Sequence, residues 1–183
     1  MDASEEFIVC LRAIVGEENA SRYASRFAPL DGEANINGLI NFELVAFYAY
    51  STSMFWHQYI NEQLWTGEPN ANVLVFRDTL NAALAKFPVY RGNGGTVYRG
   101  YKANDVDAFL KHYVVGETVS FPGFTSASFK EELAFGGNLL FIIRALTARV
   151  ISYVCATYDE FEVLIPAGRN FEVVGIVRDP TRR

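Results

Sequence analysis

The first ninety residues carry apolar side chains at spacings of three and four, which is the period of an amphipathic helix. Residues 42–65, FELVAFYAYSTSMFWHQYINEQLW, follow this spacing and predict a helix or a pair of helices facing a core. Residues 73–87 predict another helix, whose core side consists of Leu74, Phe76, Leu80, Ala83 and Leu84. Pro88 closes this helix, because proline cannot continue its hydrogen-bond ladder.

Beyond Gly92 the pattern changes to short β-rich runs that glycine and proline separate. These runs are centred near residues 98, 122, 142, 151, 163 and 174. Helices followed by a series of strands are typical of an α+β domain, so we expect a helical part over about residues 1–90 and an antiparallel, sandwich-like part over about 91–183. A chain of 183 residues without a repeat or a linker is most simply a single domain, residues 1–183.

Composition and charge narrow the possible partners. Half of the residues are hydrophobic and 15% are aromatic, which is enough for a packed interior. The formal net charge of -5 provides no broad cationic surface, so nucleic acid is a disfavoured partner. The N-terminus is acidic ahead of a short apolar stretch, the wrong charge order for a secretory signal. No apolar stretch reaches the roughly 20 residues of a membrane helix, so we expect a soluble chain without a membrane span.

The few cysteines and histidines argue against several kinds of site. Cys10 and Cys155 form no Cys-x-x-Cys pair, which favours a cytosolic setting with free, mostly buried thiols over a zinc or redox motif. His57 and His112 lack the His-Glu-x-x-His spacing, and no Gly-x-Ser-x-Gly is present. The segment GNGGTVYRG leads into a strand and lacks the Gly-Lys-Ser/Thr ending of a phosphate-binding loop. We therefore expect no bound metal, no serine hydrolase and no Rossmann or P-loop site.

Two glutamates, Glu160 and Glu162, stand two residues apart at the start of the apolar run VLIP. Residues two apart in a strand project to one face, and Leu164 shares that face, so both carboxylates would border an apolar surface. Partial desolvation prepares a carboxylate for chemistry. Taken alone, however, the pair is more typical of an exposed strand end with solvated acids.

Two further stretches supply groups that a carboxylate site could use. Arg99 lies in the strand-like run VYRGY, where its fork of donors suits an anion, and Gly100 permits a close backbone approach by a ligand. In FPGFTSASF, Ser126 and Ser128 share a face, and a hydroxyl there can hold a carboxylate in one rotamer. Each stretch alone is more typical of an ordinary half-exposed strand.

Taken together and in this order, the three stretches resemble the arginine-serine-glutamate class of mono-ADP-ribosyltransferases, the branch of the clostridial C2 and iota toxins. That family's pattern is an aromatic-Arg, a Ser-Thr-Ser and a Glu-x-Glu. It is matched here by Tyr98-Arg99, by Ser126-Ala127-Ser128 and by Glu160-Phe161-Glu162. Residues 42–65 are also similar to a family helix that carries a tyrosine, then Ile-Asn and Leu, here Tyr50, Ile60-Asn61 and Leu64.

The likeness covers roughly residues 40–176 and includes two departures. Ala127 replaces the middle threonine, which should matter little because the outer hydroxyls share the useful face. Trp65 stands where many members have an arginine, which weakens the expected grip on the pyrophosphate of NAD.

The resemblance implies a split β-sandwich of two roughly perpendicular antiparallel sheets, with NAD as cosubstrate in the cleft and no metal. Arg99 would hold the phosphates and ribose, and Ser126 would bond and position Glu162. Glu162 would accept a hydrogen bond from the 2'-hydroxyl of the nicotinamide ribose and stabilise the cation that forms as nicotinamide leaves. The other NAD contacts that the resemblance implies are Tyr98, Gly100, Ser128, Phe135, Asn61 and Tyr50.

The resemblance also assigns an acceptor side to Glu160, because glutamate at this position goes with arginine acceptors in the family. A guanidinium is cationic and a poor nucleophile, so a carboxylate would orient it and take its proton. Tyr158 would pack on the target. Phe135 would cover nicotinamide from a loop made mobile by Gly136 and Gly137.

The implied function is transfer of ADP-ribose from NAD to an arginine of a target protein. The enzyme would be a bacterial toxin, effector or phage-encoded modifier that acts in the cytoplasm, whether it is delivered into a target cell, released from a larger precursor or made inside the cell where it acts. An immunity protein is a further expected partner. Water, RNA or a small guanidine compound are alternative acceptors for the same chemistry. A glycosidase pair fits poorly because two acids on one strand cannot flank a sugar, and a non-catalytic module is disfavoured because Arg99, Ser126 and both glutamates are present.

Overall fold

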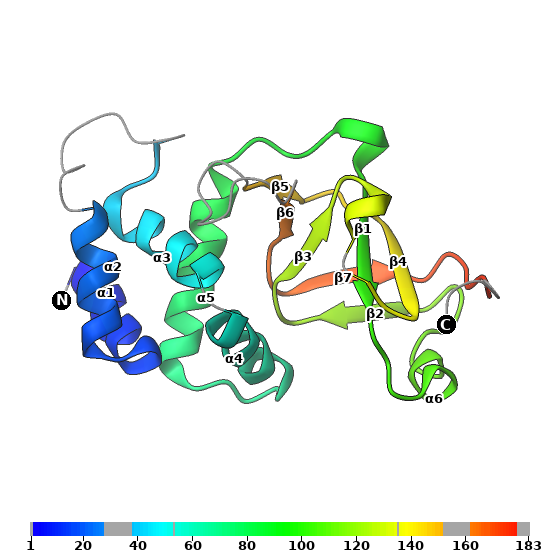
Figure 1. Ribbon diagram of the computed structural model, residues 1–183, viewed down its shortest axis with the longest axis horizontal. Helices are drawn as coiled ribbons and strands as arrows, with labels where there is room; N and C mark the ends of the chain where they lie inside the picture. Colours follow the sequence, from blue (N-terminus) through cyan, green and yellow to red (C-terminus); the bar gives the residue numbers. More distant parts are fainter. Residues whose placement is uncertain (1, 28–37, 53, 135, 152–161, 179–183) are drawn as a thin grey trace. The chain divides into compact units, whose positions relative to one another are not determined.

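The computed structural model falls into two compact units (Figure 1). It describes residues 2–27, 38–52, 54–134, 136–151 and 162–178. One unit holds the described chain up to Pro88 together with Ile151, and the other holds Val89–Val150 and the described chain from Glu162 onward. Helices form the first unit and strands dominate the second, so the predicted change of structure near residue 90 is confirmed. That the two parts make a single domain stays a prediction.

The first unit contains five helices in its described residues. They are α1 (Ala3–Val15), α2 (Glu17–Phe27), α3 (Asn41–Thr52), α4 (Met54–Trp65) and α5 (Ala71–Ala85). The region predicted as a helix or a helix pair is thus a pair, α3 and α4. None of the described helices has the length and apolar character needed to cross a bilayer.

Local side chains fix where these helices begin and which side they bury. The Asp2 side chain accepts a hydrogen bond from the Glu5 amide and the Glu5 side chain accepts one from the Asp2 amide, which is a capping box at the start of α1. In α5 the buried side includes Val73 rather than the predicted Leu74, which is half-buried. Val73, Phe76 and Leu80 follow one another at helical spacing and form the start of the buried stripe. Leu74 lies at the border of this stripe.

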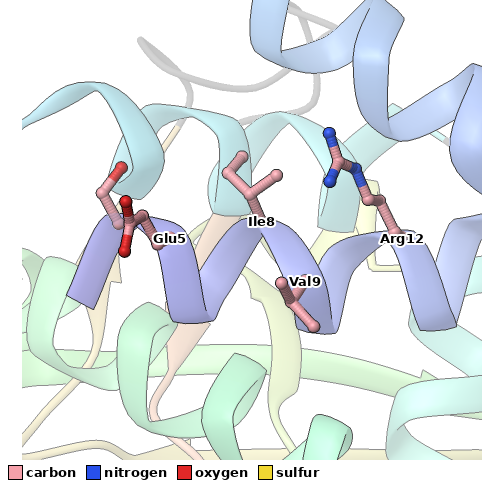
Figure 2. A pocket seen from close by; sticks show the side chains of 5 residues that line it. Glu5, Ile8, Val9 and Arg12 are labelled. Carbon is pink, nitrogen blue, oxygen red and sulfur yellow. The ribbon is translucent and has the colours of Figure 1, made fainter. Parts of the chain in front are cut away.

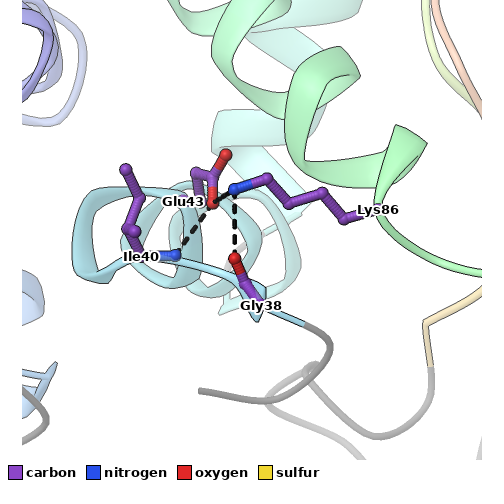
Figure 3. A network of polar contacts seen from close by, with 4 residues as sticks. All are labelled: Gly38, Ile40, Glu43 and Lys86. Atoms are coloured by element: carbon purple, nitrogen blue, oxygen red, sulfur yellow. Dashed lines mark hydrogen bonds and ion pairs between the residues drawn. The ribbon is translucent and has the colours of Figure 1, made fainter. Parts of the chain in front are cut away.

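An ion pair between a buried carboxylate and a partly exposed ammonium group joins the start of α3 to the end of α5 (Figure 3). One carboxylate oxygen of Glu43, a residue that is 4% exposed, accepts hydrogen bonds from the Ile40 amide at 2.9 Å and from Lys86 Nζ at 2.6 Å. Lys86 Nζ also donates to the carbonyl oxygen of Gly38 at 3.1 Å. Because Glu43 caps the first turn and pairs with Lys86, the position of α3 depends on α5.

The second unit contains a five-stranded sheet and a two-stranded sheet, both antiparallel. The strands are β1 (Thr96–Tyr101), β2 (Thr118–Phe121), β3 (Thr125–Ser128), β4 (Leu139–Arg144), β5 (Arg149–Val150), β6 (Glu162–Ile165) and β7 (Arg169–Glu172), with the short helix α6 (Val106–Leu110) between β1 and β2. Their orders are β4-β1-β3-β6-β5 and β2-β7. Figure 1 shows β2 and β7 running across β1 and β4, and the predicted α+β class is confirmed.

The core of this unit lies on the face of the large sheet that meets the small one. It consists of Val97, Ala127, Ile143, Ala145, Ala148, Val163 and Ile165. Phe121 of β2 packs against Phe141 of β4, with ring centroids 6.2 Å apart, and against Phe171 of β7 at 5.0 Å. These contacts close the two sheets into a sandwich.

The run predicted near residue 174 is displaced in the structure. Its strand, β7, ends at Glu172, and Val174 and Val177 are 84% and 92% exposed. The physical reason is the partner: Val173 still exchanges backbone hydrogen bonds with Gly116 and Glu117, and there the partner segment turns, with the Glu117 amide bonded to the Val114 carbonyl oxygen. Of the run predicted near 151, the described part contributes β5, and its remainder lies outside the described residues.

Candidate functional site

The described residues of the three sequence motifs, Tyr98, Arg99, residues 126–128 and Glu162, lie on neighbouring strands, because β3 is hydrogen-bonded between β1 and β6. Tyr98 pairs with Ser128, and Ser128 pairs with Glu162, so these three residues form one row across the sheet. Directly opposite residues share a sheet face. Ser126 belongs to the next row, opposite Leu164.

Arg99 bridges β1 and β3 where their backbone pairing stops. The two strands pair at Tyr98 and Ser128, whereas β3 and β6 pair along four residues. The Arg99 Nη1 atom donates a hydrogen bond of 2.7 Å to the carbonyl oxygen of Ser126. A guanidinium has five N–H donors, and no carboxylate among the described side chains forms an ion pair with Arg99, so further donors can serve an anion.

Arg99 lies beside an aromatic cluster that includes Phe141. Arg99 pairs in register with Phe141, whose ring lies 5.6 Å from that of Tyr113. Burial, followed by the nearby Tyr101, raises the pKa of Tyr113, and the Arg99 charge opposes this rise. Arg99 and Tyr113 are therefore electrostatic neighbours. The sequence offered no signal for this, because the fold alone brings the two segments together.

The two predicted NAD contacts of the first unit also lie together. Asn61 Nδ2 of α4 donates a hydrogen bond of 3.1 Å to the hydroxyl oxygen of Tyr50 in α3. The Tyr50 ring is 4% exposed and lies 5.8 Å from the ring of His57, one turn before Asn61. Asn61 and Tyr50 thus form one polar group between two packed helices.

Three predicted residues, Phe135, Tyr158 and Glu160, lie outside the described residues, and of Glu162 the structure describes the backbone. Gly137, predicted to give a loop mobility, has a different task. A Cβ atom at this position would overlap the backbone carbonyl group of Tyr101, so glycine permits close packing there.

The neighbouring Asn138 holds this packed connection in place. Its amide group donates to the carbonyl oxygen of Ala103 and accepts from the Ala103 amide, both at 2.8 Å. Asn138 precedes β4 and Ala103 follows β1, so the two bonds tie together the ends of paired strands. Sequence reasoning did not identify this clamp, because Asn138 belongs to none of the motifs.

A hollow on α1 carries none of the predicted site residues (Figure 2). It is lined by Ser4, Glu5, Ile8, Val9 and Arg12. Its charged groups already serve local contacts, Glu5 in the capping box and Arg12 in an ion pair of 3.1 Å with Glu17. Within the described ranges, no group of three or more His, Cys, Asp and Glu side chains could hold a metal ion. The row on β1, β3 and β6 is therefore the candidate site.

Comparison with known proteins agrees with this geometry. The sequence matches the family described as NAD:arginine ADP-ribosyltransferase over residues 15–182. It is 33% identical over 171 residues to Mav of Mycobacterium avium, which is named as an NAD(+)–arginine ADP-ribosyltransferase. It is 30% identical over 172 residues to the NAD(+)–protein-arginine ADP-ribosyltransferase Tre1 of Pseudomonas putida.

The two matches cover most of this chain but only a small part of each relative. The matches cover 89% and 91% of this chain but 20% of Mav and 33% of Tre1, so the chain spans a third or less of these relatives. Among solved structures, the ADP-ribosyltransferase HopU1 of Pseudomonas syringae superposes with a TM-score of 0.71 at 14% identity, over 99% of this chain and 93% of HopU1. This likeness confirms the predicted ADP-ribosyltransferase fold.

Proposed function

The chain belongs to the NAD:arginine ADP-ribosyltransferase family, and we propose that it transfers ADP-ribose from NAD to an arginine side chain of a target protein. One observation carries the proposal: Arg99 of β1 and Ser126 of β3, from two motifs far apart in the sequence, are joined by a hydrogen bond, and β3 pairs with β6, the strand of Glu162. The site would thus combine a cation for phosphate with a carboxylate for the reacting ribose.

In the proposed reaction, remaining N–H groups of Arg99 bind the phosphates of NAD, and Tyr50 and Asn61 contribute further contacts. The Glu162 carboxylate accepts a hydrogen bond from the ribose 2'-hydroxyl and faces the positive charge that develops as the bond to nicotinamide breaks. Ser126 holds that carboxylate. These roles follow those of the arginine-serine-glutamate class. Arg99 would act mainly on the binding of NAD, and Glu162 would act mainly on the chemical step.

On the acceptor side, we infer that Glu160 orients the target guanidine and accepts the proton released when its nitrogen bonds the ribose carbon. Tyr158 would contact the surrounding target surface, and Phe135 would cover nicotinamide. The family name supports arginine as the acceptor, and the name of Tre1 supports a protein as its carrier. We further infer action inside a target cell and an immunity protein that protects the producing cell.

Separating the two glutamates tests this proposal. Purified wild type and the variant Glu160→Gln are incubated with NAD, with and without a small guanidine compound such as agmatine. Nicotinamide release and ADP-ribosylated agmatine are quantified separately. We expect Glu160→Gln to keep release of nicotinamide to water and to lose transfer to the guanidine. Equal loss of both reactions would refute the division of roles.

A further inference from the structure

The residue directly opposite Glu162 in the sheet is Ser128, and not Ser126. Side chains directly opposite each other on antiparallel strands have Cβ atoms about 4.5–5.5 Å apart, whereas diagonal neighbours are about 7–8 Å apart or somewhat less. A serine hydroxyl is short, so this difference decides which serine reaches more easily. The register therefore favours Ser128 as a partner of the Glu162 carboxylate.

The surroundings of the Ser128 hydroxyl leave its proton available. Ser128 is 5% exposed, and a buried hydroxyl is expected to be hydrogen-bonded. Its oxygen accepts a hydrogen bond of 3.1 Å from the Lys130 amide, which fixes the oxygen but uses none of its donor capacity. Among the described side chains, no acceptor receives the Ser128 proton, and the residue across the ladder is Glu162.

We propose that Ser128 is a second positioning residue, whose hydroxyl donates a hydrogen bond to the Glu162 carboxylate. This inference rests on the proposed function, in which Glu162 is the catalytic carboxylate. Ser126 would approach that carboxylate from the neighbouring row and Ser128 from the same row. Two donors would hold it in one rotamer, and each would favour its ionised form, which lowers its pKa.

The simpler alternative is a purely structural role, in which the Ser128 hydroxyl oxygen accepts the hydrogen bond from the Lys130 amide and so stabilises the end of β3. A purely structural role predicts a loss of folding stability without any change in the pKa of Glu162. The pKa is therefore the deciding quantity. The variant Ser128→Ala removes the donor, Ser128→Thr keeps it, and Ser126→Ala provides a matched loss of hydroxyl on the same strand.

The experiment measures the pH dependence of kcat/KM for NAD hydrolysis in these variants, together with their unfolding free energies. The acidic limb reports the pKa of the carboxylate in the free enzyme. A hydrogen bond to an ionised carboxylate corresponds to a shift of roughly 1–2 pH units. We expect Ser128→Ala to move the acidic limb upward by this amount, with KM for NAD changed by less than about twofold, and Ser128→Thr to keep the wild-type midpoint.

An unchanged acidic limb in Ser128→Ala, with a shifted one in Ser126→Ala, would overturn the proposal. A second readout does not depend on turnover: the titration of the Glu162 carboxyl carbon by NMR, assigned by the signal that Glu162→Gln removes. Wild-type protein that hydrolyses no NAD would contradict the proposed function. The NMR titration would still decide whether Ser128 lowers the pKa of Glu162.

Discussion

Arg99 Nη1 lies 2.7 Å from the carbonyl oxygen of Ser126, and this contact spans two strands at the point where their backbone pairing ends. The same guanidinium is proposed to bind the phosphates of NAD. It therefore has a double task, as a structural bridge and as an anion site. A substitution should affect folding stability and catalysis together.

Replacing Arg99 by lysine keeps the positive charge but removes the planar fork of donors. Charge-assisted hydrogen bonds contribute roughly 1.5–3 kcal/mol, so we expect kcat/KM for NAD to fall by about 10- to 100-fold. Arg144→Lys is the matched control, because Arg144 lies exposed on the neighbouring strand β4 and should change kcat/KM by less than about twofold. Equal effects of the two substitutions would exclude a special role for Arg99.

The ion pair of Glu43 and Lys86 should stabilise the helical unit. Lys86→Met leaves the buried Glu43 carboxylate without its cation, but solvent screens the pair because the Lys86 side chain is 35% exposed, so the free energy of unfolding should fall by on the order of 2 kcal/mol. Arg12→Ala breaks the exposed pair with Glu17 and should cost at most about 1 kcal/mol. Urea denaturation of both variants measures the difference. Similar small losses would mean that the pair is not needed to hold α3.

Adjacent glycines before β4 should respond differently to alanine. A Cβ atom at Gly137 would overlap the backbone of Tyr101, whereas one at Gly136 meets no atom within 4 Å. Overpacking of this kind costs about 1–3 kcal/mol, so Gly137→Ala should lower the thermal midpoint and Gly136→Ala should leave it nearly unchanged. Calorimetry of the two variants provides the comparison, and an equal response would show that the connection adapts freely.

The Cys10 thiol should react slowly with thiol reagents, and its burial should make the free energy of unfolding depend on pH. Burial, followed by the charge of Glu6, raises its pKa above the ordinary value of 9.0. The unfolded chain then loses the thiol proton at a lower pH than the folded chain does. Stability is therefore fully present below pH 9.0 and falls as the pH rises above it.

The variant Cys155→Ala isolates this thiol. Ellman's reagent at pH 8 should label the folded variant far more slowly than the same chain in denaturant. Between pH 9 and 10.5 its unfolding free energy should decline by at most about 1.4 kcal/mol per pH unit more than that of Cys10→Ala in the same background. Rapid labelling of the folded protein would show that Cys10 is accessible.

Much of the fold could be predicted from local pattern. The α5 stripe around Phe76 and Leu80 follows the helical period, and the alternation of Val163 and Ile165 with Leu164 predicts the two faces of β6. Such signals depend on neighbours in the sequence. The displaced β7 could not be predicted, because its end depends on β2, a strand that is remote in the sequence.

The candidate site shows the same division. Arg99, Ser126 and Glu162 were recognisable because each belongs to a motif with a fixed local spacing. Their placement on adjacent strands is a property of the strand order, and the opposition of Ser128 to Glu162 is a property of register. Tyr113 and Asn138 carry no motif, so only the folded chain reveals their contacts with the site and with Ala103.

The most direct test of the account is transfer of labelled ADP-ribose from NAD to cell proteins by wild-type enzyme and by Glu162→Ala. The lysate is treated with nuclease, and mass spectrometry locates the modified residue. We expect label on arginine side chains of protein, nicotinamide release that equals this label after hydrolysis is subtracted, and loss of both in a Glu162→Ala variant that remains folded. Label that persists in this variant, or that lies on RNA or on residues other than arginine, would contradict it.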